Sequence, residues 1–240
     1  MIDLLKRIGA WPQALALVSL LAASMWMLSC GNSETEAPEA ESAKPAGMRS
    51  IEVKPRTAAV GSEKFKPCVQ CHGEEGAGRI GVGPRLNSET FLAAASDEML
   101  FNTIKNGRAG TTMVSWEKSG YSDKDIENVI AYIRSWNEVA PAELNESDLK
   151  GDPKAGEVVF NSICAACHGR TGAGYQETAN GTGIGRRGFL NSASNGFLRY
   201  IIKHGKTGSK MRSFTDGANV ADLTDADIEN VIAFLRAEAW

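Results

Sequence analysis

The feature that most constrains this chain is a cluster of two cysteines and a histidine late in the sequence. Cys164 and Cys167 are separated by two residues, and His168 follows directly. This C-x-x-C-H pattern is the attachment signature of c-type haem, because two thiols can bond to the two vinyl groups of one porphyrin while the adjacent imidazole ligates the iron. A looser spacing would not serve that geometry, so the pattern predicts one covalently attached haem c.

The same pattern occurs a second time, in the first half of the chain. There, Cys68 and Cys71 precede His72. A single pattern of this kind could also be half of a zinc site or a thioredoxin-like redox pair. Zinc frameworks usually bring a second closely spaced pair of ligands, and a thioredoxin motif needs a βαβ context; the sequence indicates neither. Two haem c groups are therefore the predicted cofactors.

The use of cysteine agrees with this interpretation. Four of the five cysteines lie in the two patterns, which leaves Cys30 and no pair for a disulfide bond. The chain has 240 residues, enough for one large or two small domains, and a net charge of −3. A charge balance so close to neutral gives no indication of nucleic-acid binding.

The first 29 residues have the composition of an export signal or membrane anchor. Lys6 and Arg7 form a short basic region, and an apolar run covers residues 14–28. Small residues lead to Cys30, which resembles the lipidated cysteine of bacterial lipoproteins, although Met27 stands where that family usually has leucine. An uncleaved helical anchor and an unlipidated secreted protein are the alternatives. Each places the folded part of the chain on the outer side of the bacterial cytoplasmic membrane.

Residues 30–54 have a different composition from the rest of the chain. They are rich in Glu, Ala, Ser and Pro and contain few residues that could enter a core. Such a segment cannot bury enough apolar surface to fold by itself. We expect a flexible tether between the membrane and the domains that follow.

An internal repeat organises the remaining sequence. Residues 104–113 match residues 202–211 without a gap, and the heptapeptide at 125–131 recurs identically at 227–233. Duplication of one unit is the simplest explanation. The predicted divisions are module 1 at residues 55–139, a connector at 140–149 and module 2 at 150–240.

Each module is expected to be mostly helical with long loops. An amphipathic run over residues 153–163 precedes the second haem pattern, and Asp152 is placed to cap its N-terminus. Each module is also expected to end in an amphipathic helix, which begins after Ser122 in module 1 and after Thr224 in module 2.

A glycine recurs in the first helix of each module, at Gly61 and Gly156. Because glycine has no Cβ, it lets another backbone come close. We expect the terminal helix to cross the first helix there, with Tyr132 or Phe234 near the contact.

Taken together, these features resemble the class I cytochrome c family. The resemblance covers residues 55–139 and 150–240 and depends on the Gly and Phe of the first helix, the haem pattern, a Gly-rich segment, a methionine loop and a terminal helix with an aromatic residue. It implies an all-α fold of two tandem class I cytochrome c domains, each a small helical fold around one haem c. It also implies single-electron transfer and axial ligation of each iron by histidine and methionine.

The resemblance singles out one methionine for each iron, and thioether sulfur raises the reduction potential. Met113 aligns with Met211, whereas Met99 aligns with Phe197 and is expected in the core. His204 is a rival ligand for the second iron, and a solvated loop histidine is its alternative interpretation. The predicted iron ligands are His72, Met113, His168 and Met211.

In this family a proline carbonyl accepts the N–H of the proximal histidine and fixes its orientation. Pro84 is expected in that role. The second copy departs from this pattern, because residues 183–185 lead to Arg186 rather than proline, and the acceptor there stays open. The proline that usually follows the methionine is also absent, with Val114 and Arg212 in its place. We hypothesise that the two haems have unequal potentials.

Basic residues gather in the second module between the Gly-rich segment and the methionine. No acidic residue interrupts them. We expect a basic surface around the second haem, where an acidic redox partner docks by electrostatic steering. A solvated face that balances nearby acids is the alternative. The residues are Arg186, Arg187, Arg199, Lys203, Lys206, Lys210 and Arg212.

The sequence as a whole predicts a membrane-tethered dihaem electron carrier, free-standing or a subunit of a respiratory or photosynthetic assembly. Two other classes of function stay open. One is a haem enzyme subunit of the peroxidase or thiosulfate-oxidising kind, which would expose an open iron. The other is a sensory or structural haem subunit with no net electron flux.

Overall fold

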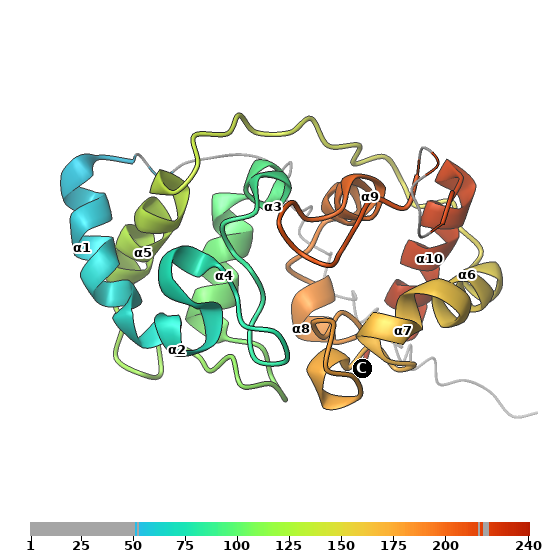
Figure 1. Ribbon diagram of the computed structural model, residues 1–240, viewed down its shortest axis with the longest axis horizontal. Helices are drawn as coiled ribbons and strands as arrows, with labels where there is room; N and C mark the ends of the chain where they lie inside the picture. The colour runs from blue at the N-terminus through green and yellow to red at the C-terminus, as the bar shows by residue number, and fades with distance from the viewer. Residues whose placement is uncertain (1–50, 52, 216, 218–220) are drawn as a thin grey trace, which may run out of the picture. The chain divides into compact units, whose positions relative to one another are not determined.

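A computed structural model of the chain describes residues 51, 53–215, 217 and 221–240. The predicted export signal or anchor, Cys30 and most of the tether lie outside the described residues. The described residues of both modules belong to one compact unit (Figure 1). None of the described helices is long and apolar enough to cross a membrane.

The described part of the chain is helical and contains no β-strand, which confirms the predicted all-α class. An isolated antiparallel bridge joins Arg79 and Gly83. The helices of module 1 are α1 (Pro55–Phe65), η1 (Lys66–Cys68), α2 (Val69–His72), η2 (Glu74–Gly76), α3 (Glu89–Ala94), α4 (Asp97–Asn106) and α5 (Asp123–Ser135).

Module 2 repeats this order after a connector without helix. Its helices are α6 (Pro153–Val159), η3 (Phe160–Cys164), α7 (Ala165–His168), η4 (Gly174–Gln176), α8 (Arg187–Leu190), α9 (Asn195–His204) and α10 (Asp225–Ala237). The division of the chain at residues 140–149 stays a prediction, because the two modules are not separate compact units.

The first and last helices of each module cross in close contact, as the glycines predict. A Cβ built on Gly61 would lie 1.9 Å from the carbonyl oxygen of Asn128 and 2.8 Å from the Cβ of Tyr132. On Gly156 it would lie 1.9 Å from the corresponding oxygen of Asn230. Any side chain at either glycine would force the two helices apart.

Aromatic rings fill the space beside each crossing. The rings of Phe65 and Trp136 lie 5.2 Å apart in an edge-to-face arrangement, and those of Phe160 and Phe234 lie 5.2 Å apart. Phe65 and Phe160 are both buried. The buried residues of the two modules join in one hydrophobic core, in which Phe91 and Phe197 meet with ring centroids 6.2 Å apart.

Both terminal helices begin at the predicted caps. The side chains of Ser122 and Thr224 accept hydrogen bonds from the backbone N–H of Asp125 and Asp227, and these aspartates return a bond to the cap. This reciprocal arrangement is a capping box, which satisfies backbone donors that a helix start leaves free. Asp152 caps α6 by accepting from the backbone N–H of Lys154, the second residue of the helix.

The amphipathic run over residues 153–163 is helical throughout, but its second half is not an α-helix. The α-helix ends at Val159, and residues Phe160–Cys164 form a π-helix. Module 2 has four steps from Phe160 to Cys164, whereas module 1 has three from Phe65 to Cys68. A π-turn absorbs one extra residue without breaking the helix, so the cysteine keeps its place relative to the core.

Candidate functional site

His72 ends helix α2 directly after the two cysteines of the first pattern. Its Nδ1 lies 2.9 Å from the carbonyl oxygen of Pro84, so an N–H at Nδ1 donates to that oxygen. This bond leaves Nε2 with a free lone pair for a metal. Gly83 lets the loop come this close, because a Cβ there would lie 2.4 Å from the carbonyl oxygen of Cys71.

Module 2 makes the same bond with a different residue. The Nδ1 of His168 lies 2.8 Å from the carbonyl oxygen of Thr182. Gly181 takes the place of Gly83, since a Cβ there would lie 2.4 Å from the carbonyl oxygen of Cys167. The alignment of the two copies placed the equivalent segment at residues 183–185, so that Arg186 took the place of Pro84, four residues too late.

Loop length explains why Thr182 was missed. The acceptor follows the histidine by 12 residues in module 1 and by 14 in module 2. A gap of two residues would have aligned Gly181 with Gly83, and that shared glycine before the acceptor was the available signal. Because the acceptor is a backbone carbonyl, any residue type can supply it, and the identity of Thr182 does not indicate this role.

Burial controls the protonation of both histidines. It lowers the pKa of His72 below the usual value, against the raising effect of the bond to Pro84, and the positive charges of Arg108 and Lys206 lower it further. Burial likewise lowers the pKa of His168, and Lys206 lowers it further. Both imidazoles are therefore neutral near pH 7, the state in which Nε2 can ligate iron.

The first cysteine of each pattern lies against the core. Cys68 and Cys164 are partly buried, and burial raises the pKa of each thiol to about 11. The second cysteine of module 2, Cys167, is exposed. Thiols with so high a pKa are poor nucleophiles at neutral pH.

Met113 lies in a tight hairpin that follows helix α4. Its carbonyl oxygen accepts a hydrogen bond of 2.8 Å from the N–H of Arg108, and its own N–H donates to Thr111 Oγ1 at 3.1 Å. Gly107, with φ of 67°, starts the hairpin in a conformation that favours glycine.

Met211 lies in an equivalent hairpin after helix α9. Its carbonyl oxygen accepts a bond of 2.7 Å from the N–H of Lys206, and its N–H donates to Ser209 Oγ at 3.1 Å. Gly205, with φ of 70°, starts this hairpin. Both methionines are partly buried against the core.

The two competing candidates for the sixth ligand lie elsewhere. Met99 is a core residue of α4 with 5 % of its surface exposed. His204 is the last residue of α9 rather than part of a loop, and its exposed ring lies 4.4 Å from the ring of Tyr200.

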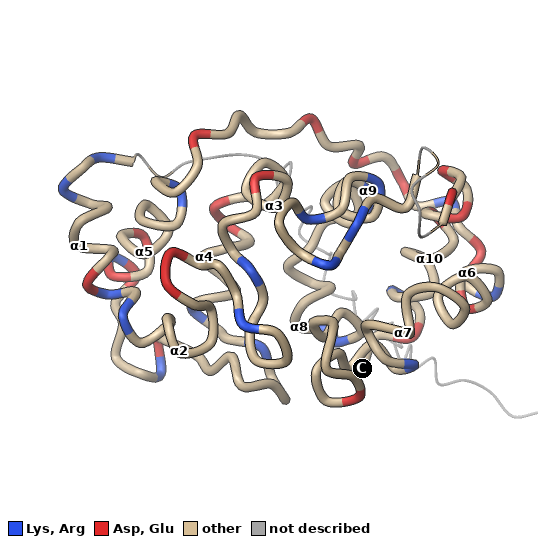
Figure 2. The backbone as a smooth tube through the Cα atoms, viewed as in Figure 1, with Lys and Arg blue, Asp and Glu red and all other residues tan. Residues whose placement is uncertain are grey.

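The basic residues between Arg186 and Arg212 do not form one continuous surface. Figure 2 shows basic positions in α9 and in the loop after it. Arg199 is buried and pairs with Glu229, while it donates to the carbonyl oxygens of Asn145 and Ser147 in the connector. This pair agrees with the alternative interpretation, in which basic residues balance nearby acids.

The other basic residues divide into two groups. Lys203 pairs with Asp225 at 3.1 Å, and Arg186 and Lys206 contact module 1. Arg187, Lys210 and Arg212 are exposed. The predicted basic surface of module 2 is therefore limited to these three residues.

These local arrangements fit a covalently held haem c in each module. The two cysteines adjoin the histidine in sequence, and the orienting carbonyl leaves Nε2 available. The Nε of Arg108 is buried and has no hydrogen-bond partner among the described residues, so a negatively charged group would satisfy it.

Comparison with known proteins gives the family. A family model described as "Cytochrome C oxidase, cbb3-type, subunit III" matches twice, over residues 61–133 and 151–235, which is more than half of the chain. The chain belongs to this family. Each match includes one C-x-x-C-H pattern, so this cytochrome has two covalently attached haem c groups as cofactors, and its general role is electron transfer.

Curated relatives match parts of this cytochrome. The cbb3-type cytochrome c oxidase subunit FixP of Azorhizobium caulinodans is 34 % identical over 117 residues, 46 % of this chain and 37 % of the relative. Subunit CcoP of Rubrivivax gelatinosus is 31 % identical over 154 residues, 64 % of this chain and 47 % of the relative. The chain thus spans less than half the length of these two subunits.

A smaller relative matches a single stretch. Cytochrome c-554(548) of Halomonas halodenitrificans is 34 % identical over 80 residues, which is 32 % of this chain and 94 % of the relative. A length of 80 residues is about that of one module.

Proposed function

We propose that this cytochrome is a membrane-tethered dihaem carrier that passes single electrons between respiratory redox partners on the outer side of the cytoplasmic membrane. The names of its relatives support a place beside a terminal oxidase, either as a bound subunit or as a carrier that visits the complex. Haem iron, when bound, supplies a one-electron ferric/ferrous couple. A lipid on Cys30 or an N-terminal helix would provide the tether.

The observation that carries this proposal is the recurrence of one local arrangement in both modules. In each, a histidine follows a C-x-x-C pair, its Nδ1 is bonded to a backbone carbonyl, and a methionine lies in a hairpin closed by a basic residue. We assign Cys68 and Cys71 to the first haem, with His72 as its proximal ligand. Module 2 supplies Cys164, Cys167 and His168 to the second.

Met113 and Met211 are the proposed sixth ligands. Backbone hydrogen bonds and a hydroxyl, from Thr111 or Ser209, hold their hairpins, so the backbone that carries each thioether is fixed before iron binds. A fixed methionine on each iron excludes small ligands and keeps the protein an electron carrier rather than a haem enzyme.

Carbon monoxide binding tests this assignment against an enzyme with an open iron. We expect the reduced, fully loaded protein to bind carbon monoxide slowly and incompletely, because methionine occupies the sixth position. Met113→Ala and Met211→Ala should each open one iron to rapid binding. Met99→Leu is the matched control and should leave binding unchanged. Rapid binding by the unaltered protein would contradict the proposal.

Exposed cations beside Met211 offer a docking surface for an acidic partner. Lys210 and Arg212 flank the methionine, and both are exposed. We expect oxidation by ferricyanide, an anionic probe, to slow as ionic strength rises, because salt screens the attraction. Lys210→Gln with Arg212→Gln should weaken that dependence. A rate indifferent to salt in the unaltered protein would remove this part of the proposal.

The tether has its own test. We expect the mature protein to fractionate with membranes, and Cys30→Ser to release it if the anchor is a lipid. Continued fractionation of the variant with membranes would indicate a retained N-terminal helix instead.

A further inference from the structure

The two modules contact each other through a reciprocal set of side chains. Arg85 of module 1 lies against Gly208 and donates from Nη1 to its carbonyl oxygen at 3.0 Å. Arg186 of module 2 lies against Gly110, where a Cβ would be 2.4 Å from its Nη1. Gly110 and Gly208 are equivalent positions of the internal repeat.

A second pair of cations follows the same symmetry. The guanidinium of Arg108 lies 4.8 Å from the ring of Phe189 in the other module. Lys206 lies 4.4 Å from the ring of Phe91, again across the junction. Arg108 and Lys206 are equivalent in the repeat, so each module contributes two cations to the junction.

This group, which we call the junction cations, comprises Arg85, Arg108, Arg186 and Lys206. Within the described part of the chain none of them forms an ion pair with an acidic residue. The Nε atoms of all three arginines are buried and lack a hydrogen-bond partner there. The four side chains are partly buried. Burial of a positive charge without a counter-charge is unfavourable, so the junction lacks an anion.

The pKa values of Lys206 and Arg108 also reflect the excess of positive charge at the junction. Burial, and then the positive charges of Arg108 and Arg85, lower the pKa of Lys206 to about 7. Burial lowers the pKa of Arg108 to about 10. No carboxylate acts on either group to raise its pKa.

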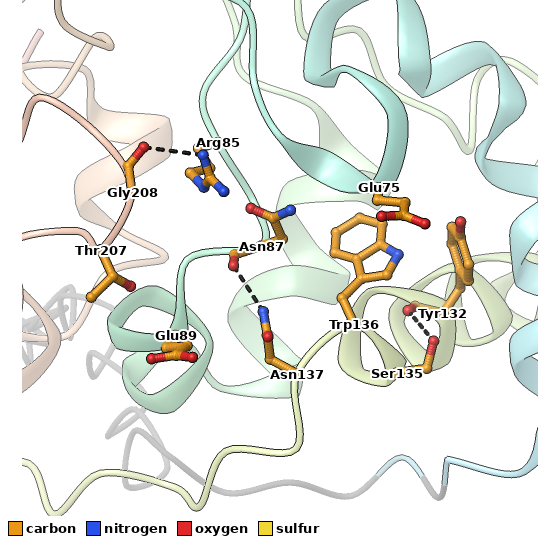
Figure 3. A pocket seen from close by; sticks show the side chains of 10 residues that line it. All are labelled: Glu75, Arg85, Asn87, Glu89, Tyr132, Ser135, Trp136, Asn137, Thr207 and Gly208. Carbon is orange, nitrogen blue, oxygen red and sulfur yellow. Dashed lines mark hydrogen bonds between the residues drawn. The ribbon is translucent and has the colours of Figure 1, made fainter.

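A cavity of about 690 Å³ opens beside Arg85 (Figure 3). Asn87 and Trp136 line it from module 1, and Thr207 and Gly208 line it from module 2. Trp136 Nε1 is buried without a partner among the described residues, as is the Nε of Arg85. Two lining residues thus carry a buried donor without a partner, and two others, Glu75 and Glu89, carry carboxylates.

Position relates the junction cations to both candidate iron sites. Lys206 of module 2 donates from Nζ to the carbonyl oxygen of Arg85 at 3.0 Å, so its charge lies beside the loop that orients His72 in module 1. Arg108 and Lys206 also close the hairpins of Met113 and Met211 through their backbone N–H groups. Arg108 and Lys206 thus belong to the methionine hairpins, and their side chains reach rings of the other module.

We propose that the junction cations bind the propionate carboxylates of both haems, with Lys206 shared between the two sites as the residue that links their reduction potentials. Each haem c carries two propionates, so four cations meet four carboxylates. The inference depends on haem attachment in both modules, which is part of the proposed function, but not on any redox partner.

Lys206→Gln tests the proposal in the full chain, once its mass shows both haems attached. Loss of a positive charge near an iron favours the ferric state and lowers the midpoint potential. We expect both midpoints to fall and the propionate bands of the resonance Raman spectrum to shift. Lys206→Arg should restore both signals. Lys154→Gln removes the same charge from an exposed position on α6 and should change neither.

Arg85→Gln provides a second variant from the other module, in case Lys206→Gln does not mature. It should shift the propionate bands in the same way. A shift confined to the second midpoint, or unmoved propionate bands, would overturn the proposal. So would a change of the midpoints with added phosphate at constant ionic strength, because a free anion would then occupy the junction.

These outcomes are separate from those of the proposed function. Potentials and Raman bands are measured on the isolated protein, without a partner. A protein that exchanges electrons rapidly but shows no response to Lys206→Gln would retain the proposed function and lose this inference. A protein that responds to Lys206→Gln but exchanges no electrons with a redox partner would retain this inference and lose the proposed function.

Discussion

The two modules reach the same local geometry through different sequences. Module 1 orients its histidine with Pro84 after 12 residues, and module 2 uses Thr182 after 14. Module 1 joins its first helix to the cysteines by three steps, and module 2 uses four and a π-helix. The fold therefore conserves where the acceptor carbonyl and the first cysteine lie. The residue type and the number of residues that lead to each of them differ between the modules.

An arginine in the last helix of each module makes equivalent hydrogen bonds, but its side-chain partner is charged in module 1 and neutral in module 2. Arg134 in α5 donates to the carbonyl oxygens of Leu92 and Ala95 at 2.6 Å each and pairs with buried Asp97 at 2.9 Å. Arg236 in α10 donates to the carbonyl oxygens of Leu190 and Ala193 and meets neutral Asn195 at 3.1 Å. One clamp is therefore an ion pair and the other a neutral hydrogen bond.

The largest expected difference between the modules comes from this clamp. Arg134→Met should reduce the free energy of unfolding of module 1 by about 3–5 kcal/mol, because it leaves the charge of Asp97 buried without its cation. Arg236→Met should cost module 2 only ~1–3 kcal/mol, the cost of unsatisfied carbonyls. Denaturant unfolding of the haem-loaded protein measures both.

A matched double variant sharpens this result. Arg134→Met with Asp97→Asn removes the uncompensated charge, and we expect it to recover part of the loss. Equal costs for the two arginines would show that the ion pair adds nothing to the hydrogen bonds.

We expect the crossing of α1 with α5 and the crossing of α6 with α10 to lose similar stability when their glycine is replaced. Gly61→Ala and Gly156→Ala each place a Cβ 1.9 Å from a carbonyl oxygen, so each should cost its module ~1–3 kcal/mol of unfolding free energy. Gly188→Ala is the control, because a Cβ there meets nothing within 4 Å. Thermal unfolding followed by circular dichroism gives the comparison, and tolerance of either crossing variant would show that the helices can separate freely.

The two capping boxes should also be equivalent, at a smaller energy. Ser122→Ala and Thr224→Ala each remove the side chain that accepts from the third residue of the helix, at a cost of about 1 kcal/mol. The measurement is again unfolding by denaturant. A much larger loss in one module would mean that its terminal helix depends more on the cap than on the crossing.

The smallest effect is expected at Thr182. Because the histidine is bonded to the backbone carbonyl of this residue, Thr182→Ala should keep the bond and change stability by less than ~0.5 kcal/mol. The second midpoint potential should also stay where it is. A clear shift of that midpoint would give the hydroxyl a role that the carbonyl alone does not explain.

Local patterns predicted much of this protein. The two C-x-x-C-H motifs, the caps at Ser122 and Thr224 and the crossing glycines act within one turn or at one contact, so sequence spacing is enough to recognise them. The π-turn before Cys164 and the acceptor Thr182 were missed, because each compensates for a change of length that only a superposition of the two modules reveals.

The number of haem groups follows from the amino-acid sequence, because each C-x-x-C-H pattern consists of residues adjacent in the chain. The helical repeat and the candidate methionine ligands follow from the match between the two copies. The tertiary structure alone decided which basic residues face solvent and which meet at the junction. Arg85 and Gly208 are 123 residues apart, and nothing in their local sequence indicates that they touch. Charges so distant in the chain acquire a common environment only when two folded surfaces come together and exclude water between them.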